Sequence, residues 1–119
     1  VNGYYWRRAS FDPSLSGYLV YHLQNMYRVE LVMRRHSNGQ IENIILEVRA
    51  DETEEWQRIT FDVLNDQHTQ GGWRDFRIAA DLESLGRSVN YLRITIAEPN
   101  AAWHPCIETV ILRGRVSAW

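Results

Sequence analysis

Aromatic, imidazole and amide side chains gather in one short connector near the C-terminal end of the chain. Residues 98–106 read EPNAAWHPC, and they place Trp103 and His104 side by side between two prolines. An indole offers a flat apolar surface, while imidazole and amide groups such as that of Asn100 donate and accept hydrogen bonds. A connector that only reverses the chain needs about two to five residues. The segment is therefore expected to bind a ligand.

Strand-like segments flank this connector on both sides. Residues 91–96 and 107–113 alternate between apolar and polar or aromatic side chains, which is typical of a strand with one buried face. The apolar positions are Leu92, Ile94, Ile96, Val110 and Leu112. Two strands are therefore expected to hold out a loop stiffened by proline.

The same alternation recurs along the chain between turn-forming residues. Further strands are expected at 4–8, 18–23, 27–35, 44–50, 56–63 and 73–79. A single helical turn is expected at 81–86, with Asp81 as its N-cap and Gly86 as its C-terminal stop. Short strands at this spacing predict an all-β fold, an antiparallel β-sandwich formed by residues 1–119 as one domain.

Successive connections of an antiparallel sandwich lie at alternate ends. Connections 9–16, 36–42, 64–72 and 98–106 are thus expected at one end, and this end receives three of the four histidines. A pyranose ring has an apolar C–H face that stacks on aromatic rings and a rim of hydroxyls that form hydrogen bonds. The predicted ligand is therefore a sugar, and the predicted binding residues are His36, His68, Trp73, Arg74, Asn100, Trp103 and His104.

Six arginines alternate with acidic and threonine side chains on expected strands, and they are expected to share the polar face of one sheet. They are Arg34, Arg49, Arg58, Arg77, Arg93 and Arg113. Cross-strand ion pairs explain this pattern without a ligand. A sheet cleft for a polysaccharide chain is the alternative interpretation of the same residues.

Composition excludes several other classes of protein. Apolar residues make up 45% and charged residues 24%, as in a folded globular domain. A formal charge of -2 argues against a general nucleic-acid binder. No apolar run approaches the roughly 20 residues of a membrane helix. The single cysteine, Cys106, rules out an internal disulfide and a multi-cysteine zinc site.

Three segments resemble the discoidin, or coagulation factor 5/8 C-terminal, type of galactose-binding-like domain. They are GYLVYHLQNMYRVELVMRR, IILEVRADETEEWQRI, and the closing pair from VNYLRITI to IETVILRG. This family has a jelly-roll fold that many carbohydrate-binding modules share. The resemblance implies noncatalytic binding through loops at one end. It also implies a structural calcium, for which Glu108 matches the acid before the closing apolar run.

These observations predict a noncatalytic carbohydrate-binding module for a polysaccharide or oligosaccharide. The abrupt start of the chain suggests a module cut from a longer polypeptide, and the resemblance implies an extracellular protein tethered to a glycoside-active catalytic domain. An enzyme is not expected, because glycoside hydrolysis needs two carboxylates across a cleft and no histidine spacing matches a known ligand pattern. The alternative is a protein–protein interaction domain of the same fold. Exposed tryptophans with polar neighbours would favour sugar, and one contiguous apolar patch would favour a protein partner.

Overall fold

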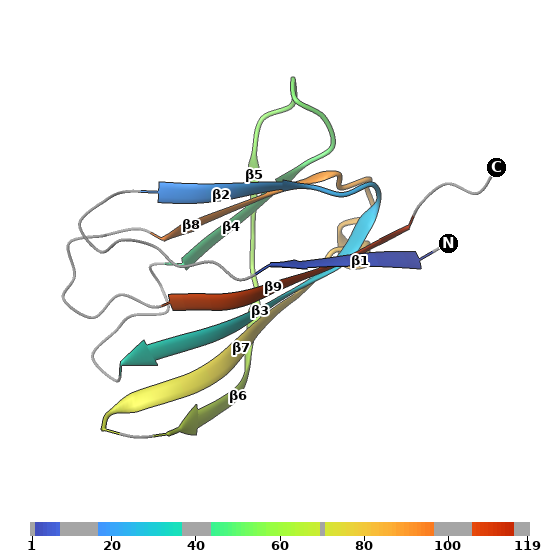
Figure 1. Ribbon diagram of the computed structural model, residues 1–119. Coiled ribbons are helices and arrows are strands. Elements are labelled where there is room, and N and C mark those ends of the chain that lie inside the picture. Colours follow the sequence, from blue (N-terminus) through green and yellow to red (C-terminus); the bar gives the residue numbers. More distant parts are fainter. Residues whose placement is uncertain (1, 8–16, 37–43, 70, 97–105, 116–119) are drawn as a thin grey trace.

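Two antiparallel sheets pack face to face in the computed structural model, which describes residues 2–7, 17–36, 44–69, 71–96 and 106–115 (Figure 1). Side chains are described for 18–34, 44–69, 71–96 and 107–115. The strands are β1 (Asn2–Arg7), β2 (Gly17–His22), β3 (Met26–His36), β4 (Ile44–Arg49), β5 (Gln57–Ile59), β6 (Asp62–His68), β7 (Trp73–Asp81), β8 (Tyr91–Ile96) and β9 (Cys106–Arg115).

The order of the strands is that of a jelly roll. The five-stranded sheet has the order β1-β9-β3-β7-β6, and the four-stranded sheet has the order β2-β8-β4-β5. Four early strands pair with later strands in reverse order: β1 with β9, β2 with β8, β3 with β7, and β4 with β5. A long antiparallel ribbon wound into two sheets gives this arrangement. The prediction of an all-β antiparallel sandwich is confirmed.

The core lies between the sheets and consists of the apolar residues that alternate along the strands. On β3, Val29, Leu31 and Met33 are completely buried, as the pattern predicts. The corresponding positions of β4, β8 and β9 are also buried: Ile44, Leu46, Val48, Leu92, Ile94, Ile96, Val110 and Leu112. Each such side chain contributes about 1.5–3 kcal/mol when it leaves water, so this core is the main stabilising term.

The strand expected at 56–63 is wrong as a single element. The chain forms β5 in the four-stranded sheet, crosses at Phe61, and continues as β6 in the five-stranded sheet. Residues 64–68, expected in a loop, therefore belong to a strand. The five-stranded sheet has one strand more than its partner, and all residues of its edge strand β6 are exposed. Val63, which continues the apolar alternation of Ile59 and Phe61, consequently keeps 39% of its surface in water.

The helical turn expected at 81–86 is present as a short 3₁₀ helix, Glu83–Leu85. Leu82 takes the N-cap position, and the Asp81 carboxylate accepts a hydrogen bond from the Glu83 N–H at 3.0 Å. Gly86 ends the turn in the left-handed conformation at φ 66°. Glycine suits this position because it has no Cβ to clash there.

Candidate functional site

Strands that lead into several predicted binding connections reach the same end of the sandwich. Ile96, the last residue of β8, pairs with the first residue of β2 and with the first residue of β4. At the same end of the other sheet, Cys106 pairs with Arg34. The predicted residues Asn100, Trp103 and His104 follow Ile96 in the sequence, and they lie outside the described residues.

Four other predicted residues lie on neighbouring strands at this end, but they divide between two faces. Trp73 of β7 pairs with His36 of β3, whereas Arg74 pairs with His68 of β6. Adjacent residues of a strand point to opposite faces of its sheet. Trp73 therefore lies on the outer face of the five-stranded sheet, and Arg74 and His68 lie on the face toward the other sheet. The imidazole of His36 is outside the described residues.

Trp73 borders a hollow of about 320 Å³ that it shares with Arg34, Thr69 and Gly71. The turn below the hollow is closed by the Thr69 N–H, which donates to the Trp73 carbonyl at 2.9 Å, and the Thr69 hydroxyl donates to the same oxygen at 3.2 Å. Gly71 and Gly72 adopt positive φ angles of 60° and 87°. The hollow thus combines a half-buried indole with polar groups on a hydrogen-bonded turn.

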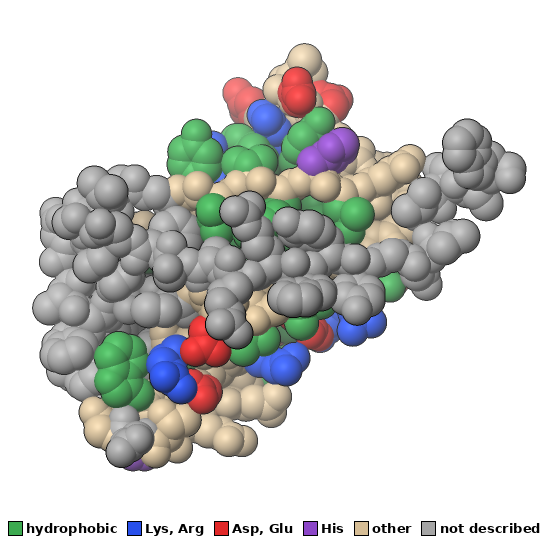
Figure 2. All heavy atoms as spheres, viewed as in Figure 1, with side chains coloured by type: hydrophobic (Ala, Val, Ile, Leu, Met, Phe, Trp, Pro, Cys, Tyr) green, Lys and Arg blue, Asp and Glu red, His purple; other side chains and the backbone are tan. Residues whose placement is uncertain are grey.

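Arg34 is held in place by carboxylates on the neighbouring strands. Its Nε lies 2.9 Å from Asp75 Oδ1 and 3.7 Å from Glu108 Oε1. Figure 2 shows basic and acidic side chains in contact near this end of the five-stranded sheet, at the lower left of the view. The guanidinium beside the indole is therefore oriented before any ligand arrives.

Glu108, the predicted calcium ligand, lies on β9 beside Arg34, and the calcium site stays a prediction. Calcium takes six to eight oxygen ligands, whereas the Glu108 carboxylate faces the positively charged Arg34. Among the described residues, no group of three or more His, Cys, Asp or Glu side chains is placed to hold a metal ion.

Arg74 is engaged on the opposite face of the sheet. Its Nε donates to Asp66 Oδ1 at 2.8 Å, and its terminal nitrogen donates to the Asp66 carbonyl at 3.4 Å. Asp66 follows Asn65, which has a positive φ of 55°, and the register of β6 against β7 shifts between Leu64 and Gln67. A β-bulge therefore turns the edge strand β6 so that Asp66 accepts hydrogen bonds from Arg74.

A second group combines two arginines of the expected row, Arg49 and Arg93, with aromatic side chains to which the sequence had given no binding role. We call it the aromatic–arginine face; it covers the outside of the four-stranded sheet and consists of Tyr18, His22, Arg49, Trp56, Tyr91 and Arg93. The His22 and Tyr91 rings stack with centroids 4.5 Å apart. The guanidiniums of Arg49 and Arg93 lie 4.1 and 4.6 Å from the Trp56 ring centre. Figure 2 shows hydrophobic, basic and histidine side chains together in this region, at the top of the view.

The expected arginine row is split between the two sheets. Arg34, Arg77 and Arg113 are on strands of the five-stranded sheet, and the other three arginines are on the four-stranded sheet. As expected, charge pairs account for part of the row: Arg93 donates two hydrogen bonds to the Glu47 carboxylate, at 3.0 and 3.1 Å. The six arginines therefore do not form a common cleft.

Comparison with known proteins identifies no relative. No protein-family model, no curated protein and no solved structure matches the chain. In the part of the chain that the structure describes, no helix is long and apolar enough to cross a membrane. The two-sheet sandwich is shown by the structure itself, and the discoidin-type resemblance stays a prediction.

Proposed function

We propose that this chain is a noncatalytic carbohydrate-binding module of the galactose-binding-like type, and that it binds a glycan at the end of the sandwich that carries Trp73. The supporting observation is the hollow beside Trp73, where an indole borders the polar groups of Arg34 and Thr69. A sugar residue needs this combination, because its C–H face stacks on a ring while its hydroxyls form hydrogen bonds.

Preorganisation strengthens the argument for this hollow. Asp75 and Glu108 hold the Arg34 guanidinium, so little side-chain entropy is lost when a hydroxyl accepts a hydrogen bond from it. Arg74 and His68, on the other face of the sheet, would contact a glycan only where it wraps around the end of β7. Asn100, Trp103 and His104 belong to the connector between β8 and β9, outside the described residues, and we propose them as further ligands of the same glycan.

Binding without catalysis is part of the proposal. A glycosidase places two carboxyl groups on either side of the scissile bond, and one of them must carry a proton. The carboxylates of Asp75 and Glu108 instead both contact the same arginine, Arg34. We further propose that the module works outside the cell, within a secreted multidomain protein that also carries a glycoside-active catalytic domain.

The test is a titration with soluble and insoluble polysaccharides, followed by tryptophan fluorescence and by calorimetry. Trp73→Ala should weaken binding of the recognised glycan at least tenfold, because loss of a stacked ring costs about 1.5–3 kcal/mol. Tyr18→Ala is the matched control, since it removes an exposed ring from the other sheet. Loss of binding in the control and not in Trp73→Ala would move the site to the aromatic–arginine face. Absence of binding to every glycan would refute the proposal.

A protein–protein interaction domain is the second candidate function. Tyr18 and Val20 are two residues apart on the edge strand β2, so they point to the same face. They expose 63% and 47% of their surfaces. Protein interfaces are enriched in tyrosine, tryptophan and arginine, and these three residue types make up most of the aromatic–arginine face, to which Tyr18 belongs. A protein ligand that binds the wild type and the Val63→Glu control but not Val20→Glu would support this function.

A further inference from the structure

A larger hollow lies at the opposite end of the sandwich from Trp73. It has a volume of about 590 Å³ and forms where β3 begins, where β7 connects to β8, and where β9 ends. None of the predicted binding residues lies at this end. The side chains that bear on its chemistry are Asn25, Tyr27, Glu83, Arg87, Ser88 and Arg115.

Backbone hydrogen bonds fix the walls of this hollow. The Met26 N–H donates to the Val89 carbonyl at 2.8 Å, and the Arg115 N–H donates to the Asn25 carbonyl at 3.1 Å. The Asn25 N–H donates to the side-chain oxygen of Asn90 at 2.8 Å. Three segments far apart in the sequence are therefore joined around this hollow, and ligand sites are usually preformed in this way.

One side of the hollow offers an aromatic ring with a guanidinium above it. The Arg115 guanidinium carbon lies 4.5 Å from the centre of the half-buried Tyr27 ring. The same guanidinium forms an ion pair with the Glu83 carboxylate. Ring, cation and carboxylate thus hold one another in a fixed arrangement.

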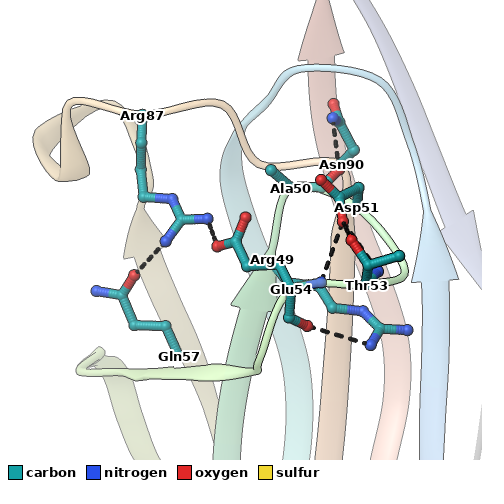
Figure 3. A network of polar contacts seen from close by, with 8 residues as sticks. All are labelled: Arg49, Ala50, Asp51, Thr53, Glu54, Gln57, Arg87 and Asn90. Atoms are coloured by element: carbon teal, nitrogen blue, oxygen red, sulfur yellow. Dashed lines mark hydrogen bonds and ion pairs between the residues drawn. The ribbon is translucent and has the colours of Figure 1, made fainter.

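Arg87 on another wall is anchored from the β4–β5 turn (Figure 3). Its guanidinium forms an ion pair with Glu54 and donates to the Gln57 side-chain oxygen at 2.9 Å. The side-chain nitrogen of Asn90 donates to the Ala50 carbonyl at 2.8 Å. These contacts tie the same turn to the connection between β7 and β8.

The charges around the hollow select the kind of ligand. Each of its two arginines is already paired with a carboxylate, Arg115 with Glu83 and Arg87 with Glu54. An anionic ligand would meet the Glu83 carboxylate, and a cationic ligand would meet the two guanidiniums. The hollow instead presents hydrogen-bond donors and acceptors beside a ring, which suits a neutral, polyhydroxylated molecule.

The geometry points to a second saccharide site in this hollow, taking an uncharged sugar residue against Tyr27 with its hydroxyls toward Glu83, Ser88 and Arg115. This inference goes beyond the proposed function, because it adds a site at the other end of the sandwich. A glycan-binding module with such a site contacts saccharide at both ends.

The test is a titration of the isotope-labelled chain with neutral and with uronate-containing oligosaccharides, followed by amide chemical shifts. A neutral oligosaccharide should shift the amides of Tyr27, Ser88 and Arg115 in a saturable way. Ser88→Trp fills the hollow from an exposed position and should weaken this response about tenfold or more. Thr60→Trp is the control, since it adds the same ring at an exposed position outside the hollow. Tyr27→Ala should have the effect of Ser88→Trp.

Each end of the sandwich gives its own amide signals, so the experiment can refute either of the two proposals independently of the other. Shifts confined to the Trp73 end would overturn the second site and leave the proposed function standing. Shifts at Tyr27, Ser88 and Arg115 that persist in Trp73→Ala would support the second site, whatever happens at the first. An equal or stronger response to the uronate would overturn the assignment to an uncharged sugar.

Discussion

Substitution of Gly114 by alanine should destabilise the sandwich through one close contact. Gly114 lies on β9 opposite Met26 of β3. A Cβ added at this position would lie 2.5 Å from the Gln24 carbonyl oxygen and 2.9 Å from both Cγ and Cδ2 of Leu23. The leucine side chain has some freedom to move, but the carbonyl belongs to the tight turn between β2 and β3. The strand or the turn must therefore shift.

The size of the effect follows from the displacement. An ordinary contact begins at 3.4 Å, so the carbonyl and β9 must separate by almost 1 Å. Overpacking of this kind costs about 1–3 kcal/mol. For a chain of this length each kcal/mol lowers Tm by about 3–6 °C, so a loss of about 2 kcal/mol lowers it by about 6–12 °C.

Thermal and urea unfolding of Gly114→Ala, followed by tryptophan fluorescence, would measure this loss. Leu23→Ala in the same background should relieve the contacts with the leucine and leave the contact with Gln24, so the pair should be less than additive. Gly71→Ala is the control, because its Cβ would meet nothing within 4 Å and only its positive φ of 60° is strained. If Gly114→Ala melts at the wild-type temperature, the close approach between β9 and the turn is refuted.

Two further predictions concern the four-stranded sheet and its β4–β5 turn. A double-mutant cycle on Arg93 and Glu47 should give a coupling free energy of about 0.5–1.5 kcal/mol, because the ion pair is bidentate and partly shielded from water. The coupling should fall as the salt concentration rises. Zero coupling at low salt would contradict this prediction. Hydrogen bonds from the Thr53 hydroxyl and N–H lower the pKa of Asp51 below its usual 3.8. Asp51 should therefore stabilise the fold above that pH and lose this contribution as the pH falls through its lowered pKa. Carboxyl titration by NMR should show a higher pKa for Asp51 in Thr53→Ala, and an unchanged value would contradict the assigned cause.

Much of the fold could be predicted because burial leaves a period of two in the sequence. β3 and β8 each have one face between the sheets, so Val29, Leu31, Leu92 and Ile94 alternate with polar residues and are buried as expected. The same signal failed where the chain changed sheets. The alternation of apolar and polar residues continues across Phe61. Nothing in the local sequence reveals that the residues after Phe61 join the five-stranded sheet, as an edge strand that the four-stranded sheet does not cover.

The candidate site was harder to predict because its parts are set by register as well as by loop position. Trp73 and Arg74 were assigned to one end of the sandwich, but as neighbours in a strand they point to opposite faces of the sheet. The stack of His22 on Tyr91 needs the exact pairing of β2 with β8. Such pairing joins residues far apart in the sequence, so a local pattern does not reveal it.

These contacts give a physical reason why the basic residues of this sequence are arginine and not lysine. All 13 basic side chains are arginine, and several of them serve two partners at once. Arg93 binds Glu47 through two nitrogens and lies over the Trp56 ring, and Arg115 pairs with Glu83 while lying over Tyr27. A planar guanidinium does both, whereas a lysine ammonium is a point charge that satisfies one partner well. Each of these two arginines contacts a carboxylate and a ring together, and a side chain already held in this way loses less entropy when a ligand binds.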